Sequence, residues 1–356
     1  MIKRPQSIKA GDTIGITAPS YGPGIEPYRS MYFISAEKLK ERGYNLVEGE
    51  TLFKTDGIGI ATKPEFAAAE LVSFYKRDDI NAIISAGGGE LMNETVTHVD
   101  FEELRNYKPK WFLGYSDNTN FIFPLVTITG VQGIYGPCIN GFAKKWETPE
   151  TDAIAILEGT KSSFDGYKRF VAPQESSEGE GSVEYTDEML RAPYDFNTDR
   201  ELVSYIGQNG IVKPSEGKEI VMEGVLLGGC LDILVHFTAT RFDRMKEFNE
   251  KHRNVIWIME ACDLSPMEIR RSLWNLREAG WFDSAAGFII GRPRASWGME
   301  MLGADQYNAV TGALDVLGKP IVMDAEISHI DPLLPTIMGA EARVTVKGND
   351  LNITYI

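Results

Sequence analysis

Three residues of the types that cooperate in nucleophilic hydrolysis each stand at the end of an apolar run. Ser116 follows "WFLGY", Glu260 ends "NVIWIME", and His329 follows "IVMDAEIS". A histidine can take the proton of a serine hydroxyl, and a carboxylate can fix the histidine tautomer and stabilise its charged form. The chain order Ser, Glu, His also occurs among known catalytic triads. Because buried strands of α/β proteins gather sites at their carboxyl ends, these residues predict a Ser-Glu-His site.

The turn that carries Ser116 has two interpretations. In "KPKWFLGYSDNTNFIF", residues 108–123, a helix-like run follows an apolar run at once. Serine and aspartate are ordinary helix N-caps, which is the structural interpretation. The functional interpretation is a nucleophile elbow, a tight turn that exposes a hydroxyl above a sheet. Asn118 stands where the common G-x-S-x-G elbow has its second glycine, so we expect an elbow by geometry rather than by that motif.

The acid and the base have structural alternatives as well. Glu260 could cap a helix or pair with Arg270 or Arg271, since an unpaired buried carboxylate is costly. Asp263 suits helix capping better, because Ser265-Pro266 follows it. His329 precedes a proline-restricted loop, where a purely structural role has about even odds.

A run of three glycines could add an oxyanion-binding loop to the three residues of the predicted site. Gly87, Gly88 and Gly89 follow the apolar run "INAIISA", and backbone without side chains can present N–H groups to an oxyanion beside the N–H of Asp117. The rival interpretation is a phosphate or dinucleotide loop, but the G-x-G-x-x-G spacing is missing. No cluster of His, Cys and Asp has metal-ligand spacing, so we expect neither a metal nor a cofactor.

Alternating strands and helices must position these residues. The first half predicts strands at 12–18, 44–49 and 80–86 and helices at 27–42 and 64–76, which indicates a doubly wound parallel sheet. The expected division is an N-terminal α/β domain over 1–164 with the nucleophile, an acidic linker or loop over 165–209, and a mixed C-terminal domain over 210–356 with the acid and the histidine. In the last part, helices are expected at 265–279 and 304–317 and a hairpin at 341–356.

Composition narrows the class of protein. The 356 residues carry a net charge of −15 with a pI near 4.9, so neither a nucleic acid nor an anionic membrane is an expected partner. The first residues lack the apolar core of a signal peptide, and no run approaches a membrane span. Cys138, Cys230 and Cys262 are too widely spaced for a disulfide framework or a metal knuckle. We therefore expect a cytoplasmic protein.

Long motifs spread over nearly the whole chain resemble one family. They are "APSYG", "IISAGGGELMNETVTHVDF", "KPKWFLGYSDNTN", "LLGGCLDIL", "IMEACDLSPMEIRRSLWNLREAGWF", "FIIGRPR" and "DAEISHIDPLLP". They are similar to the LD-carboxypeptidase family of serine peptidases, and most to its branch of microcin C self-immunity peptidases. The resemblance implies a flavodoxin-like N-terminal domain, a smaller C-terminal domain with barrel character, and a homodimer.

By position, the resemblance implies roles for particular residues. The family's nucleophile falls on Ser116, its acid on Glu260 and its histidine on His329. Its oxyanion donors fall on the glycine loop around Gly88 and Gly89 and on the amide of Asp117. One departure is Ser328, where the family commonly has glycine.

The expected reaction is metal-free hydrolysis of an amide bond near a free carboxylate. The family's substrates imply a murein peptide or a peptidyl or aminoacyl nucleotide, and the alternative is a ligand-binding protein without catalysis. A carboxylate clamp is expected from Arg270 and Arg271 or from Arg292 and Arg294, because guanidinium groups bind carboxylates in bidentate fashion. A nucleobase would need a flat aromatic partner, for which the candidates are Trp146, Tyr185 and Tyr194.

Overall fold

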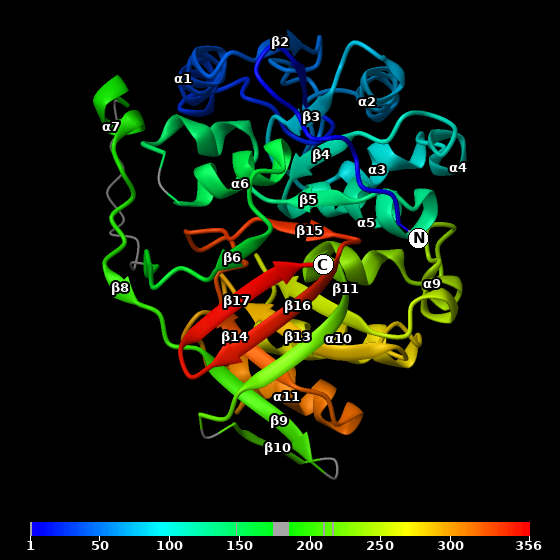
Figure 1. Cartoon of the computed structure of the whole chain (residues 1–356), viewed down its shortest axis with the longest axis vertical. Coiled ribbons are helices and arrows are strands. Elements are labelled where there is room, and N and C mark those ends of the chain that lie inside the picture. Colours follow the sequence, from blue (N-terminus) through cyan, green and yellow to red (C-terminus); the bar gives the residue numbers. More distant parts are fainter. Residues whose placement is uncertain (1, 147, 174–184, 209–210, 216) are drawn as a thin grey trace.

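Two sheets with their covering helices lie one above the other in the chain (Figure 1). This computed structural model describes residues 2–146, 148–173, 185–208, 211–215 and 217–356. Among these residues, no helix combines the length and the apolar character needed to cross a membrane.

The upper sheet has six strands in the order β15-β5-β4-β3-β1-β2. Its first five strands in the chain are parallel and follow the flavodoxin-like order 2-1-3-4-5, which confirms the predicted doubly wound sheet. Three of the strands are short apolar runs buried at every position, as a sheet covered on both faces requires. The bounds are β1 Thr13–Thr17, β2 Asn45–Glu48, β3 Ala82–Ser85, β4 Trp111–Gly114, β5 Gly133–Tyr135 and β15 Thr336–Met338.

Helices flank this sheet between its strands. The predicted helix at 27–42 is α1 Tyr28–Glu41, and it ends beside Gly43, whose φ of 91° suits glycine. The helix predicted from Pro64 begins there, because proline is favoured at the first helical position. The others are α2 Pro64–Lys76, α3 Met92–Thr97, α4 Phe101–Leu104, α5 Thr119–Pro124 and α6 Thr148–Glu158.

The lower sheet is mixed and has nine strands in the order β10-β9-β14-β13-β12-β11-β16-β17-β6. Strands β11 to β14 are parallel, and the flanking strands run antiparallel to them. The bounds are β6 Ser163–Asp165, β9 Val203–Gln208, β10 Ile211–Pro214, β11 Ile220–Cys230, β12 Val255–Glu260, β13 Ala285–Gly291, β14 Ile321–Ala325, β16 Glu341–Lys347 and β17 Asp350–Tyr355.

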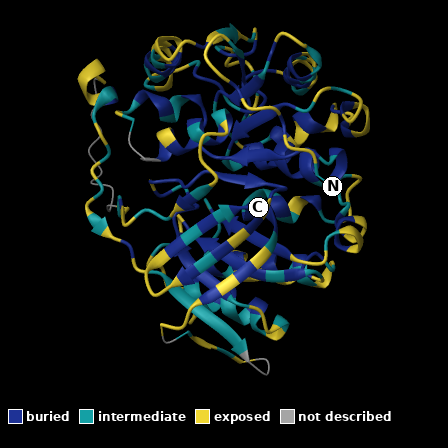
Figure 2. Cartoon of the chain, in the orientation of Figure 1, coloured by how far each residue is buried: buried dark blue, intermediate teal, exposed yellow. Residues whose placement is uncertain are grey.

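Strand β11 gives the lower sheet its curvature. Its first half pairs with β16 and its second half with β12, so the sheet coils along this strand. The predicted hairpin is confirmed as β16 and β17, and Figure 2 shows buried positions alternating with exposed or intermediate ones along both strands. The remaining helices are α7 Asp187–Arg191, α8 Leu231–Leu234, α9 Met245–Lys251, α10 Pro266–Glu278 and α11 Gln306–Leu314.

Two strands cross the expected domain boundaries. Strand β15, from the C-terminal part of the chain, pairs with β5 in the upper sheet, and β6, which spans the expected boundary between residues 164 and 165, pairs with β17 in the lower one. The segment expected as a linker carries structure of its own: the two-stranded pair β7 Arg169–Phe170 and β8 Thr198–Asp199, helix α7, and β9. Residues 174–184 of that expected linker lie outside the described residues.

Candidate active site

Ser116 lies on a strained turn directly after β4. Its φ is +62°, a left-handed value that few residues other than glycine adopt, and it opens the short 3-10 helix Ser116–Asn118. Tyr115, not Ser116, occupies the N-cap position of that helix. Such strain is kept where the surrounding structure enforces it, most often at functional sites. The geometry therefore favours the elbow interpretation over the N-cap interpretation.

The buried carboxylate of Asp117 holds this turn in place. It accepts hydrogen bonds from the Ser20 hydroxyl, from the backbone N–H of Met92 at 2.9 Å and from Nδ2 of Asn120 at 2.7 Å. Both oxygens of this carboxylate therefore accept hydrogen bonds that hold the turn. The part of Asp117 that the resemblance assigns to the oxyanion site is its backbone amide, which follows the nucleophile directly.

The glycine loop after β3 lies against Ser116. A Cβ atom placed on Gly88 would lie 3.1 Å from Cβ and 3.2 Å from Oγ of Ser116, with the amide nitrogen of Asp117 at 4.0 Å. The carbonyl of Gly87 accepts from Nδ2 of Asn118, and that of Gly88 accepts from the N–H of Tyr21. Any side chain at position 88 would crowd the hydroxyl, so the loop needs glycine at this point.

Glu260 and His329 form a buried pair. Nδ1 of His329 lies 2.8 Å from Oε2 of Glu260, and their side chains are 10% and 0% exposed. Nε2 of His329 has no hydrogen-bond partner among the described residues, although Cys262 lies beside the ring. The carboxylate thus occupies one ring nitrogen and leaves the other for a substrate or a nucleophile, as a triad requires.

The pair also shifts the two pKa values in opposite directions. Burial lowers the pKa of His329, but the negative charge of Glu260 and its hydrogen bond to the ring, with Cys262 nearby, raise it well above its usual value. Burial alone would raise the pKa of Glu260, but the facing His329 and hydrogen bonds from His329 and Tyr135 lower it. Both shifts favour the charged forms.

Tyr135 connects this pair to Ser116. Its hydroxyl donates to Oε1 of Glu260 at 2.6 Å and accepts from the backbone N–H of Ser116 at 3.1 Å. The ring of Tyr115, the residue before the nucleophile, lies 5.0 Å from the ring of His329, measured between centroids. Residues from β4, β5, β12 and the loop after β14 thus converge where the two sheets meet. The sequence analysis did not single out Tyr135, although it ends the apolar run "VQGIY".

All three free cysteines also lie around this site. Nδ2 of Asn118 lies 3.6 Å from Sγ of Cys138, and burial raises the pKa of that thiol to about 12. Sγ of Cys230, on the strand beside Glu260, lies 3.4 Å from Oδ2 of Asp232. Cys262 follows Glu260 by two residues. Each cysteine stands near the end of an apolar run in the sequence, and this was the feature from which their place near the site could have been predicted. Among the described residues, no group of three or more His, Cys, Asp or Glu side chains is arranged to hold a metal ion.

The expected clamp arginines have different surroundings. Arg270 donates to the backbone carbonyls of Asn308 and Gly312, which ties α10 to α11, and Arg271 is exposed on the same helix. Arg292, a candidate for the clamp, is fully buried and donates to the backbone carbonyl of Asp324 and to Glu326, so its guanidinium is not open to a substrate. Arg294 is exposed, and its Nη1 lies 3.6 Å from Sγ of Cys262. It is the arginine of this set placed beside the Glu260 and His329 pair.

Trp146 does not lie beside Ser116. Its indole N–H donates to the carbonyl of Phe142 at 2.8 Å, and the Arg42 guanidinium lies 5.4 Å from its ring centroid. Arg42 ends α1, at the amino edge of the upper sheet, whereas Ser116 lies at the carboxyl edge. Of the other aromatic candidates, Tyr194 stacks on Phe196 and Tyr185 is exposed.

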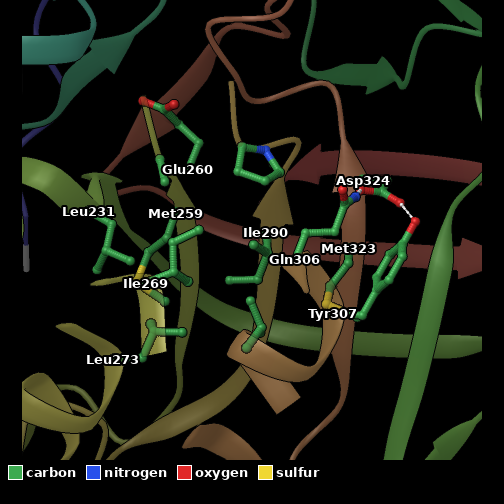
Figure 3. Close-up of a pocket in the computed structure, with 14 residues that line it drawn as sticks. Leu231, Met259, Glu260, Ile269, Leu273, Ile290, Gln306, Tyr307, Met323 and Asp324 are labelled. Atoms are coloured by element: carbon green, nitrogen blue, oxygen red, sulfur yellow. Dashed lines mark hydrogen bonds between the residues drawn. The ribbon is translucent and has the colours of Figure 1, made fainter. Parts of the chain in front are cut away.

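A small cavity lies behind Glu260, between the lower sheet and helices α10 and α11 (Figure 3). Apolar side chains such as Met259, Ile269 and Leu273 line most of it. Its volume is about 20 Å³, which holds roughly one water molecule. In Figure 3 the Glu260 carboxylate points away from Ile269 and Leu273. The cavity is therefore a packing void behind the acid rather than a substrate pocket.

The solved structures with similar folds include one of the microcin C7 self-immunity protein MccF in complex with aspartyl sulfamoyl adenosine. It matches with a TM-score of 0.75 over 98% of each chain, at 21% identity, which establishes the shared fold.

Comparisons by sequence agree. The E. coli microcin C7 self-immunity protein MccF is 23% identical over 98% of this chain and 94% of its own. A Bacillus subtilis protein named as a murein peptide carboxypeptidase is 24% identical over 95% and 90%, and a Vibrio cholerae protein named as a carboxypeptidase is 31% identical over 95% and 94%. Models of the LD-carboxypeptidase N-terminal and C-terminal domains match residues 14–136 and 223–344. The chain belongs to the LD-carboxypeptidase family of serine peptidases.

Proposed function

We propose that this peptidase hydrolyses an amide bond near a free carboxylate through an acyl-enzyme on Ser116, with His329 as general base and Glu260 as its orienting acid, and without a metal. The observation that carries the proposal is the hydrogen-bonded set in which Tyr135 joins the Ser116 backbone to Glu260, and Glu260 holds His329. The strained φ of Ser116 supports it independently.

The geometry supports a two-step reaction. Nε2 of His329 takes the proton from the Ser116 hydroxyl as Oγ attacks the carbonyl carbon. The negative charge that develops on the carbonyl oxygen is stabilised by backbone N–H groups of Gly88, Gly89 and Asp117. Collapse of the intermediate breaks the C–N bond, and His329 returns the proton to the leaving amine. A water molecule, activated by the same histidine, then hydrolyses the ester and frees Ser116.

Two substrate classes fit this reaction. The relatives are named for microcin C7 self-immunity and for murein peptides, so the candidates are an aminoacyl or peptidyl nucleotide and a murein tetrapeptide. Both carry negative charge, while the chain has a net charge of −15, so a local cation is needed to hold the substrate. We assign this role to Arg294, because it is exposed beside Cys262 at the edge of the site.

A parallel assay of the purified enzyme tests the proposal and selects the substrate. The two substrates are a tetrapeptide ending in diaminopimelyl-D-Ala and aspartyl sulfamoyl adenosine, with Ser116→Ala as control. Cleavage of one substrate by the wild type, lost in Ser116→Ala, supports the proposal and identifies the class. Arg294→Ala should raise KM with little change in kcat, because it binds substrate without reacting. Binding without turnover of either substrate would indicate a non-catalytic binding protein instead.

We also propose a homodimer in a reducing, cytoplasmic setting. The three cysteines are unpaired, as expected of a protein from a reducing compartment. Ile25, Tyr28 and Phe33, in and just before α1, are each about half exposed, and such apolar surface is typical of protein interfaces. Light scattering after gel filtration, with and without dithiothreitol, checks the assembly, and loss of activity in reductant would contradict the cytoplasmic assignment.

A further inference from the structure

The hydroxyl of Tyr135 has a position that the triad alone does not account for. The side chain is fully buried at the end of β5, in the upper sheet, and its partner Glu260 ends β12, in the lower sheet. The hydroxyl makes two hydrogen bonds, one to a carboxylate of the lower sheet and one from the backbone of the strained Ser116 turn. It is therefore a direct polar link between the nucleophile's backbone and the acid.

We propose that Tyr135 is a positioning residue, whose hydroxyl holds the Ser116 turn in register with Glu260 and so fixes where Ser116 lies relative to His329. This inference rests on the proposed function. The N–H of Ser116 has to find an acceptor inside the protein, and the Tyr135 oxygen supplies it. A second hydrogen bond to the lower sheet lies three residues further on, where Oγ1 of Thr119 accepts from the N–H of Cys230 at 3.0 Å, whereas the Tyr135 hydroxyl reaches Ser116 itself, at its φ of +62°.

The same hydroxyl controls the charge that faces His329. Its O–H bond stabilises the carboxylate form of Glu260 and shares its negative charge. When that donor is removed, the carboxylate acts more strongly on His329, so the pKa of His329 rises and the base is neutral only at higher pH. The other titratable or charged groups around the pair are Tyr115, Cys230, Asp232, Cys262, Asp263, Arg294 and Asp331, and the substitution Tyr135→Phe leaves all of them in place.

A matched control exists in the same chain. Tyr355 is also buried, and its hydroxyl accepts a hydrogen bond from the backbone N–H of Ile337 at 2.9 Å. Tyr355→Phe therefore removes the same kind of backbone acceptor without touching Ser116, Glu260 or His329. It reports what the loss of a buried hydroxyl does to folding alone.

The test measures the rate at which a fluorophosphonate labels Ser116, from pH 5 to pH 10, in the wild type, Tyr135→Phe and Tyr355→Phe. This reaction needs the nucleophile and the base but no substrate. For Tyr135→Phe we expect a labelling rate about 10- to 100-fold lower, as for the loss of a hydrogen bond to a charged group. We also expect the acid limb of its pH profile, where the rate rises with pH, to move to higher pH. Tyr355→Phe should keep the wild-type rate and limb.

Three results would contradict the positioning role or the proposed function. An unchanged rate and limb in Tyr135→Phe, or the same loss in both variants without a shifted limb, overturns the positioning role while the proposed function stands. No labelling of folded wild type overturns the proposed function itself. If Tyr135→Phe does not fold, 3-fluorotyrosine at position 135 replaces it. Its more acidic hydroxyl is a stronger donor to Glu260, so the limb should move to lower pH, and an unmoved limb contradicts the inference.

Discussion

Nδ1 of His329 and Oε2 of Glu260 lie 2.8 Å apart in a site where both side chains are withdrawn from solvent. An ion pair in these surroundings is screened little by water or salt, so each partner strongly influences the protonation of the other. Activity should depend on this coupling.

The pH dependence of the reaction follows from it. The pKa of His329 is raised well above its usual value, and the base must be neutral to accept the Ser116 proton. Hence kcat/KM should still be rising above pH 6.5, the ordinary pKa of histidine, and reach its plateau only in the alkaline range. In Glu260→Gln, which removes the negative charge, the limb should move to lower pH. A wild-type profile that is already flat at pH 6.5 would show that His329 does not titrate as its surroundings dictate.

The triad should behave as one unit. Ser116→Ala and His329→Ala should each lower kcat by about 10⁶-fold, and the double variant should lose little more. Glu260→Gln should cost least, about 10⁴-fold, since the carboxylate orients the base and does not react. If Glu260→Gln is silent and Asp263→Asn is inactive, Asp263 is the true acid. Single-turnover rates for the five variants measure this.

Gly88→Ala tests the fit between the glycine loop and the nucleophile. The added Cβ would lie 3.1 Å and 3.2 Å from Cβ and Oγ of Ser116, closer than ordinary contacts, and would shift the loop amides away from the oxyanion. We expect kcat to fall by about 10²- to 10³-fold, as for the loss of one oxyanion donor, with a folded protein by circular dichroism. Activity close to that of the wild type would argue against an oxyanion role for this loop.

A buried charge cluster near the histidine loop should dominate stability. Nη1 of Arg200 and Nη1 of Arg292 lie 2.9 Å and 3.4 Å from the Glu326 carboxylate, and all three side chains are at most 2% exposed. Glu326→Gln leaves two buried guanidinium groups without their counter-ion, which should lower the free energy of unfolding by about 3–5 kcal/mol. The exposed Glu223, paired with Arg343, is the control: Glu223→Gln should change it by less than about 1 kcal/mol. Urea unfolding measures both, and equal effects would refute the assignment.

Much of the fold could be read from local signals. Helix α10 lies within the predicted range 265–279, and nearby residues begin it: Ser265 caps it in a capping box with Glu268, where Asp263 was the expected cap. The hairpin of β16 and β17 was predicted from strict alternation of apolar and polar residues. Ser116, Glu260 and His329 were singled out because each stands at the end of a buried run, where position alone carries information.

What the sequence did not reveal depends on contacts between distant segments. The pairing of β15 with β5 joins residues about 200 positions apart, and no local pattern specifies it. Arg292 follows a buried strand much as Arg294 does, but its burial depends on Glu326 and on Phe170, whose ring centroid lies 4.1 Å from the guanidinium carbon. The role of Tyr135 likewise requires Glu260 from the other sheet.

We propose that Ser116 is a nucleophile activated by His329. Incubation of the folded protein with a fluorophosphonate, followed by peptide mass spectrometry, tests it most directly. We expect one adduct, on Ser116, with none in Ser116→Ala and far slower labelling in His329→Ala. The absence of an adduct on Ser116 in folded wild type, or equal labelling in His329→Ala, would contradict it.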